Sequence, residues 1–134
     1  MTDDLLSRAR EALEHSYAPY SEYEVGAALE TADGEVYVGC NAENANFSNS
    51  LHAEQVALGT AVAEGHTEFE RIAVTSAARD GLTPCGSCRQ TLAEFCGEAF
   101  EVVCDEGDGD TSTYTLGELL PNTITREMVE EGPE

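Results

Sequence analysis

Residues 50–65, SLHAEQVALGTAVAEG, are the segment that decides the fold of this 134-residue chain. Apolar side chains recur along it, Ser50 can cap its start, and a glycine can end it. The pattern predicts a helix from about residue 51 to residue 64, with His52 and Glu54 in its first turn.

Helices and strands alternate on both sides of this helix. The predicted elements are a helix at 3–17, strands at 25–30 and 35–39, the helix at 51–64, a strand at 71–75, a helix at 84–96, strands at 99–104 and 112–115, and a short helix at 116–120. Such alternation favours right-handed crossovers within one sheet covered by helices. We therefore expect residues 1–134 to form a single α/β domain, a three-layer α/β/α sandwich around a mixed sheet of about five strands.

A metal-binding pattern lies at the starts of two of these helices. His52 lies at the start of the helix predicted at 51–64, and Pro84-Cys85-Gly86-Ser87-Cys88 lies at the start of the helix predicted at 84–96. One imidazole and two thiolates are ligands that zinc prefers, and three protein ligands leave a fourth tetrahedral position for water. The sequence predicts one catalytic Zn²⁺ per chain, held by His52, Cys85 and Cys88.

Glu54 lies two residues after a predicted zinc ligand. A carboxylate at this place can move protons between the water and a substrate, and this arrangement is a signature of zinc deaminases. The alternative is an ordinary carboxylate in the first turn of a helix, where it interacts with the helix dipole. Beside the three metal ligands, the catalytic interpretation is favoured.

The chain is strongly acidic: 27 Asp and Glu stand against six arginines and no lysine, which gives a formal charge of -21. Concentrated salt screens the resulting self-repulsion, so we expect a salt-adapted protein. Nucleic acid is disfavoured as a partner because binding to phosphates relies on basic side chains.

No apolar run approaches the roughly 20 residues of a membrane span, and the amino terminus lacks a signal-like segment, so a cytoplasmic location is expected.

Other polar and sulfur-bearing residues have weaker patterns. Asn41, Glu43 and Asn44 follow a predicted strand and serve either turn formation or recognition of substrate hydroxyls. Arg89 either bonds near the thiolates or forms an ion pair on the helix surface. The remaining residues of interest are expected to be structural: His15 and His66 exposed, Cys40, Cys96 and Cys104 as small buried side chains, and 105–110 as a solvated acidic turn.

With these residues in view, the chain resembles a cytidine deaminase of the short, single-domain, homotetrameric type. The matching segments are Ala18-Pro19-Tyr20-Ser21, Val25-Gly26-Ala27-Ala28, Gly39-Cys40-Asn41, Glu43-Asn44-Ala45, His52-Ala53-Glu54, Pro84 to Gln90, and Glu118-Leu119-Leu120-Pro121. The zinc pattern is shared by the whole deaminase superfamily. The Asn41-x-Glu43-Asn44 pattern is particular to its nucleoside branch.

The resemblance implies a role for each matching position. His52, Cys85 and Cys88 would bind zinc, Glu54 would carry the proton, Asn41 and Glu43 would bind the ribose, main-chain groups around Ala53 and Thr83 would read the base, and Tyr23 would pack on the substrate. The implied reaction is attack of hydroxide on C4 of cytidine or deoxycytidine, with loss of ammonia, in pyrimidine salvage. The implied partner is a small nucleoside, with neither nucleic acid nor membrane.

Three departures from the pattern of the short type involve four positions. His52 and Gln55 replace a usual Cys and Arg, and the two changes are electrostatically consistent because one fewer thiolate needs less compensation. Tyr23 replaces a usual Phe. Ile124 stands at the place of a C-terminal Phe that caps a neighbouring subunit's site.

Two rival functions remain at this point. A relative acting on blasticidin S, guanine, deoxycytidylate or tRNA adenosine would share the zinc pattern, but phosphate-bearing substrates call for basic anchors that the polar cluster lacks. A structural zinc module would need a fourth protein ligand, and the sequence offers none near the other three.

Overall fold

The structure is a computed structural model that describes residues 2–131. Its elements are α1 (Thr2–Leu13), β1 (Val25–Thr31), β2 (Val36–Cys40), the 3-10 helix η1 (Phe47–Asn49), α2 (Ala53–Ala63), β3 (Phe69–Ser76), α3 (Gly86–Ala93), β4 (Glu101–Gly107), β5 (Asp110–Thr115), α4 (Leu116–Leu119) and α5 (Arg126–Glu131). In this part of the chain no helix is long and apolar enough to cross a bilayer.

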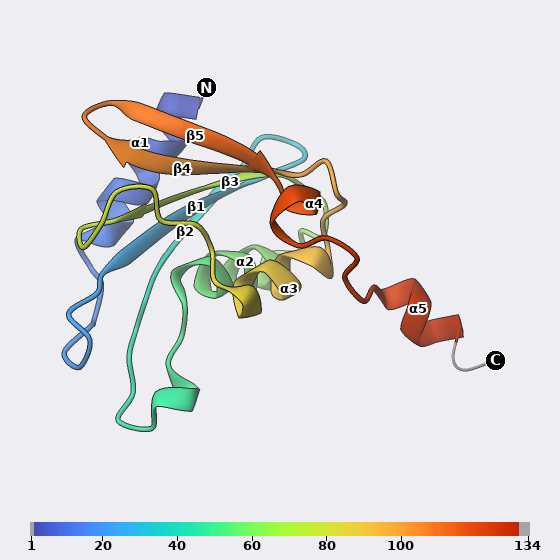
Figure 1. Ribbon diagram of the computed structural model, residues 1–134, viewed down its shortest axis with the longest axis horizontal. Coiled ribbons are helices and arrows are strands. Elements are labelled where there is room, and N and C mark those ends of the chain that lie inside the picture. The colour runs from blue at the N-terminus through green and yellow to red at the C-terminus, as the bar shows by residue number, and fades with distance from the viewer. Residues whose placement is uncertain (1, 132–134) are drawn as a thin grey trace.

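The five strands form one mixed sheet in the order β2-β1-β3-β4-β5. Strands β3 and β4 pair in parallel, whereas the other neighbours are antiparallel. Helix α1 packs on one face of the sheet, and α2 and α3 cover the other (Figure 1). Alternate strand residues therefore face two separate cores, Ala28 toward α1 and Leu29 toward α2. The predicted three-layer α/β/α fold is confirmed.

Glycine lets α2 lie directly against the sheet. A Cβ atom at Gly39 in β2 would stand 2.3 Å from the carbonyl oxygen of Ala53 and 2.6 Å from the amide nitrogen of Ala57. No side chain fits in that space, because real contacts of a Cβ atom are longer than 3 Å. The contact falls on the first residue of α2, so it also places the adjacent His52.

The ends of the helices differ from the predictions. His52, not Ser50, is the N-cap of α2, because η1 occupies the chain just before Ser50. Helix α1 ends four residues before the predicted end, Tyr17, whose amide nitrogen instead bonds the carbonyl oxygen of Asn41 at 2.9 Å. Helix α3 ends at Ala93 rather than at residue 96. Helix α5 was not predicted, since no apolar periodicity marks its sequence, REMVEE.

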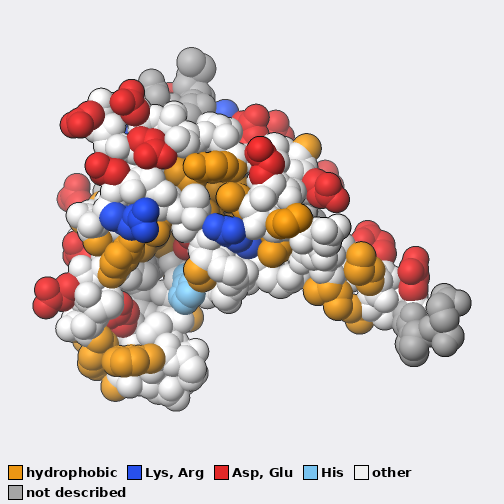
Figure 2. Space-filling model, in the orientation of Figure 1, with side chains coloured by type: hydrophobic (Ala, Val, Ile, Leu, Met, Phe, Trp, Pro, Cys, Tyr) orange, Lys and Arg blue, Asp and Glu red, His pale blue; other side chains and the backbone are white. Residues whose placement is uncertain are grey.

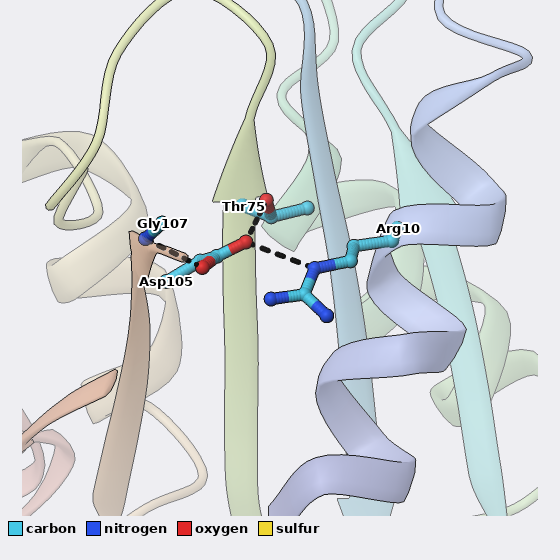
Figure 3. A network of polar contacts seen from close by, with 4 residues as sticks. All are labelled: Arg10, Thr75, Asp105 and Gly107. Atoms are coloured by element: carbon cyan, nitrogen blue, oxygen red, sulfur yellow. Dashed lines mark hydrogen bonds and ion pairs between the residues drawn. The ribbon is translucent and has the colours of Figure 1, made fainter. Parts of the chain in front are cut away.

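Asp105 is nearly buried, which corrects the prediction of a solvated turn at this position. Its side chain is 11% exposed, and it accepts hydrogen bonds from Arg10 Nε at 3.0 Å, Thr75 Oγ1 at 2.8 Å and the Gly107 amide at 2.9 Å (Figure 3). Burial alone would raise the pKa of Asp105, but these three bonds hold it below its ordinary value. The carbonyl oxygen of Asp105 also accepts from the amide of Gly81, so one residue joins α1, β3 and the loop after β3.

Two glycines give a matched test of the contact between α2 and the sheet. We expect Gly39→Ala to lower the free energy of unfolding by about 1–3 kcal/mol, because the methyl group overpacks against the α2 backbone. Gly59→Ala, within α2 at a position with open space around it, should raise that free energy by about 0.5–1 kcal/mol. Urea unfolding measures both. A Gly39→Ala protein as stable as the parent would refute the close packing.

Candidate active site

Three potential metal ligands meet where α2 and α3 begin. His52 is the N-cap of α2, Cys85 is the N-cap of α3, and Cys88 lies in the first turn of α3. The Nδ1 atom of His52 is 3.2 Å from the sulfur of Cys85 and 3.2 Å from that of Cys88. The structure thus brings together residues that are 33 and 36 positions apart in the sequence.

This donor set fits a zinc ion. Zinc bonds of ~2.0–2.1 Å to nitrogen and ~2.3 Å to sulfur place tetrahedral ligand atoms roughly 3.5 Å apart. All three donor atoms lie within 4.8 Å of one another. The group has three members among residues 2–131, so a tetrahedral ion held by them would have one position left for a ligand from outside the protein.

A bound cation would change the charge state of the groups in this cluster. Glu54, in the first turn of α2, is only 5% exposed, and its Oε1 atom lies 3.6 Å from the sulfur of Cys88. Burial raises the pKa of Glu54, and burial together with the nearby acid raises that of the Cys88 thiol. Two acidic groups side by side in a dry place are stabilised as anions by a metal ion, which deprotonates a coordinating thiol.

The helix caps also favour anions at this place. N-caps are usually Ser, Thr, Asp or Asn, whose side chains bond the free amides of the first turn. His52 and Cys85 make no such bond with their side chains. The amides at both helix starts are thus left to stabilise negative charge, as expected beside thiolates and a carboxylate.

A cavity of about 280 Å³ opens beside this cluster. Its lining residues are Ser21, Tyr23, Val25, Asn41, Glu43, Ser50, Leu51, His52, Ala53, Glu54, Leu82, Thr83 and Cys85. Every residue predicted from the sequence for the site is among them except Cys88, which is 1% exposed and lies behind the cavity wall. The cavity therefore joins the predicted metal ligands to the predicted substrate-binding residues.

Asn41 and Glu43 both line the cavity and hold one of its walls. The Asn41 amide donates to the Tyr23 carbonyl oxygen at 2.8 Å and accepts from the Val25 amide at 3.0 Å. The Glu43 carboxylate accepts from main-chain and side-chain groups at the start of this segment, and the bonds from Ser21 lower the pKa of Glu43. The structure shows the first alternative for these residues, organisation of the chain segment, and the second, recognition of substrate hydroxyls, stays a prediction for two residues that line the cavity.

Arg89 fixes the segment that precedes Cys85. Its guanidinium donates to the carbonyl oxygens of Pro84 and Leu119, both at 2.7 Å, and to the Thr83 hydroxyl at 3.0 Å. Of the two interpretations of Arg89, a bond near the thiolates and a surface ion pair, the structure agrees with the first, because Thr83 and Pro84 directly precede Cys85. The bonds go to oxygen atoms and not to the thiols themselves.

Several residues predicted to be structural lie outside this cavity. His66 is not fully exposed, since its ring packs against Tyr37 and its Nε2 atom lies 3.3 Å from a Glu35 carboxylate oxygen. Among the cysteines predicted to be buried, Cys104 is buried, while Cys40 and Cys96 are half-buried.

Sequence reasoning missed part of the cavity wall. Ser21, Val25, Ser50, Leu51 and Leu82 line it, and none was assigned a role in the site. Three segments around residues 21–25, 50–54 and 82–85 converge here only through tertiary folding. The available signal was that Ser21 and Val25 lie within segments that match the deaminase pattern.

Comparison with known proteins places these observations in a family. Residues 1–104 match the family described as "Cytidine and deoxycytidylate deaminase zinc-binding region". The chain is 38% identical over 125 residues to a cytidine deaminase of Sporosarcina psychrophila, with 93% of this chain and 92% of the relative covered. It is 41% identical over 123 residues to one of Halalkalibacterium halodurans, with 92% and 93% covered.

Solved structures agree with the sequence relatives. The crystal structure of cytidine deaminase from Burkholderia pseudomallei has a TM-score of 0.88 and 41% identity, and the match covers 92% of this chain and 99% of that one. The structure of the enzyme from Mycobacterium tuberculosis has a TM-score of 0.81 and 33% identity, covering 91% and 95%. The fold, the metal-ligand cluster and these matches together show that the chain belongs to the cytidine and deoxycytidylate deaminase family.

Proposed function

We propose that this chain is a zinc-dependent hydrolase that converts cytidine and deoxycytidine into uridine and deoxyuridine with release of ammonia, as a step of pyrimidine salvage in the cytoplasm. One observation carries the proposal: the His52, Cys85 and Cys88 cluster borders a cavity that holds a buried carboxylate and a polar wall with Asn41 and Glu43. The names of the relatives support the same activity. The catalytic unit is the single domain 1–134.

The residues of the cluster have separate tasks in this proposal. His52, Cys85 and Cys88 hold one Zn²⁺, which when bound supplies a Lewis acid that makes water nucleophilic at neutral pH. Glu54 takes a proton from the attacking water and delivers it to the ring nitrogen next to C4, and it then passes the proton of the new C4 hydroxyl to the amino group, which leaves as ammonia. Its burial keeps bulk water from competing for that proton.

The remaining wall residues orient the nucleoside. Main-chain groups of Ala53 and Thr83 bind the edge of the base, and the Tyr23 ring packs against the substrate. Asn41 and Glu43 accept or donate hydrogen bonds at the sugar hydroxyls. The carboxylate of Glu43 suits a free nucleoside, because it would repel a phosphate-bearing substrate.

Exposed hydrophobic side chains and an acidic surface support the proposal of an oligomer that forms in concentrated salt. Large exposed hydrophobic side chains lie near the cavity at Tyr17, Tyr20, Phe47 and Leu51, and on the carboxyl-terminal segment at Ile124, Met128 and Val129. Figure 1 shows α5 extending away from the sheet, and Figure 2 shows acidic side chains mostly around the upper and left margins of the visible face. We propose a homotetramer in which Ile124 approaches a neighbour's site, on a surface adapted to concentrated salt and with neither nucleic acid nor membrane as a partner.

Ultraviolet absorbance of purified protein in molar KCl tests the function. We expect turnover of cytidine and deoxycytidine, little turnover of free cytosine, and one zinc per chain by metal analysis. Chelation should abolish ammonia release and zinc should restore it. Turnover by verified metal-free protein, or faster turnover of a purine or a nucleotide than of cytidine, would contradict the proposal.

Glu54→Gln tests the proton carrier. We expect kcat to fall by about 10²–10⁴-fold, because the amide cannot accept the proton. Zinc content should remain at one per chain, since Glu54 is not among the three ligands. The control is Glu64→Gln at the exposed end of the same helix, which should leave kcat unchanged. A Glu54→Gln enzyme with a near-normal rate would remove Glu54 from the mechanism.

Sedimentation and activity across salt concentrations test assembly and adaptation. At 1 M salt the screening length is about 3 Å, which suppresses repulsion between acidic surfaces. We expect an active tetramer in molar KCl, and loss of both assembly and activity in dilute buffer. Sucrose of matched osmolality should not substitute for KCl. A fully active monomer would contradict the shared site, and equal behaviour in dilute buffer would contradict salt adaptation.

A further inference from the structure

Ser21 sits between the Glu43 carboxylate and the wall of the cavity. Its hydroxyl donates to Glu43 Oε2 and accepts from the amide of Tyr23 at 3.0 Å. Its own amide and that of Tyr20 donate to the other carboxylate oxygen, Oε1, at 3.0 and 3.1 Å. Ser21, Tyr23 and Glu43 all line the cavity beside the metal-ligand cluster.

Counting acceptor sites shows what Glu43 has left for a ligand. A carboxylate oxygen offers about two lone pairs. The two amides occupy those of Oε1, and the Ser21 hydroxyl takes one at Oε2. One acceptor site therefore remains on Oε2, which matches a single sugar hydroxyl. The three bonds also fix the rotation of the carboxylate, so this remaining site has one direction.

The same hydroxyl links two parts of the wall. Glu43 holds residues 20 and 21, whereas Asn41 holds Tyr23 and Val25. Ser21 joins these two attachments, because it bonds both Glu43 and the Tyr23 amide. The backbone between them turns at Glu22, whose φ of 57° lies in the left-handed region that residues with a side chain adopt rarely.

We propose that Ser21 is a positioning residue for the sugar of the nucleoside: through its hydroxyl it directs the remaining acceptor site of Glu43 and fixes the place of Tyr23. This inference rests on the proposed function, because it requires a substrate that carries a sugar hydroxyl. The role of Ser21 lies in binding and not in the chemical step, since its contacts are with the wall residues Glu43 and Tyr23 and not with Glu54 or the three ligands.

Ser21→Ala removes the hydroxyl and leaves the two main-chain bonds to Oε1 in place. The carboxylate then rotates more freely, and the Tyr23 amide loses its acceptor. The sugar hydroxyl then meets an acceptor site that is no longer oriented, and because a hydrogen bond to a charged group is worth about a factor of ten or more, we expect KM for cytidine to rise about tenfold. The kcat should stay within twofold, and the melting temperature should not change, because the segment is exposed.

Two further variants make the test specific. Ser21→Thr keeps the hydroxyl and should restore KM to within about twofold of the parent. Thr31→Val is the matched control: the Thr31 hydroxyl also donates to a carboxylate, that of Asp33, and accepts from an amide, that of Glu35, but it lies at the opposite end of β1 from Val25 and outside the cavity. It should leave KM unchanged.

Each result decides between the two claims. A parent enzyme active on cytidine with an equal KM in Ser21→Ala overturns the role of Ser21 and leaves the proposed function intact. A fall in kcat together with the melting temperature also overturns it, because Ser21 would then be structural. A parent protein without cytidine turnover overturns the proposed function and this inference with it.

Discussion

The arrangement of the site depends on the contact between the start of α2 and strand β2. Because Gly39 has no side chain, the carbonyl of Ala53 lies on the strand, and the preceding residue, His52, is carried to the start of α3. Two helix starts then place an imidazole, two thiols and the carboxylate of Glu54 in one small volume. These helices are capped by potential metal ligands rather than by good capping side chains, which indicates that local helix stability gives way to the site.

The opposite wall of the cavity is organised by a second principle. Asn41 and Glu43 follow β2 and use their polar side chains to hold residues 20–25, the segment that leads into β1. A loop fixed in this way presents oriented acceptors at little entropic expense when a ligand binds. The apolar core and the polar wall thus meet at the cavity. The core keeps the helix starts in place, and the wall orients the hydrogen-bond acceptors.

Sequence patterns predicted the parts that depend on neighbouring residues. The alternation of helices and strands follows from local periodicity, and the spacing of Cys85 and Cys88 identifies a ligand pair within one helical turn. The burial of Asp105 and the bond of Arg89 to Leu119 depend on segments distant in sequence, so no local pattern indicated them. The role of Ser21 in the wall was hidden for the same reason. The early end of α1 was missed because pairing of Tyr17 with residues after β2 overrides helical periodicity.

Asp105 gives the amino-terminal helix an influence beyond the face that it covers. Its side chain accepts a hydrogen bond from Arg10, while its carbonyl oxygen accepts one from the amide of Gly81, two residues before Thr83 in the cavity wall. The outer helix and the rim of the cavity therefore share a single anchor. Shortening the chain at its amino end, or fusing a bulky tag that displaces α1, would loosen that anchor, so such changes act on the rim from the far side of the sheet.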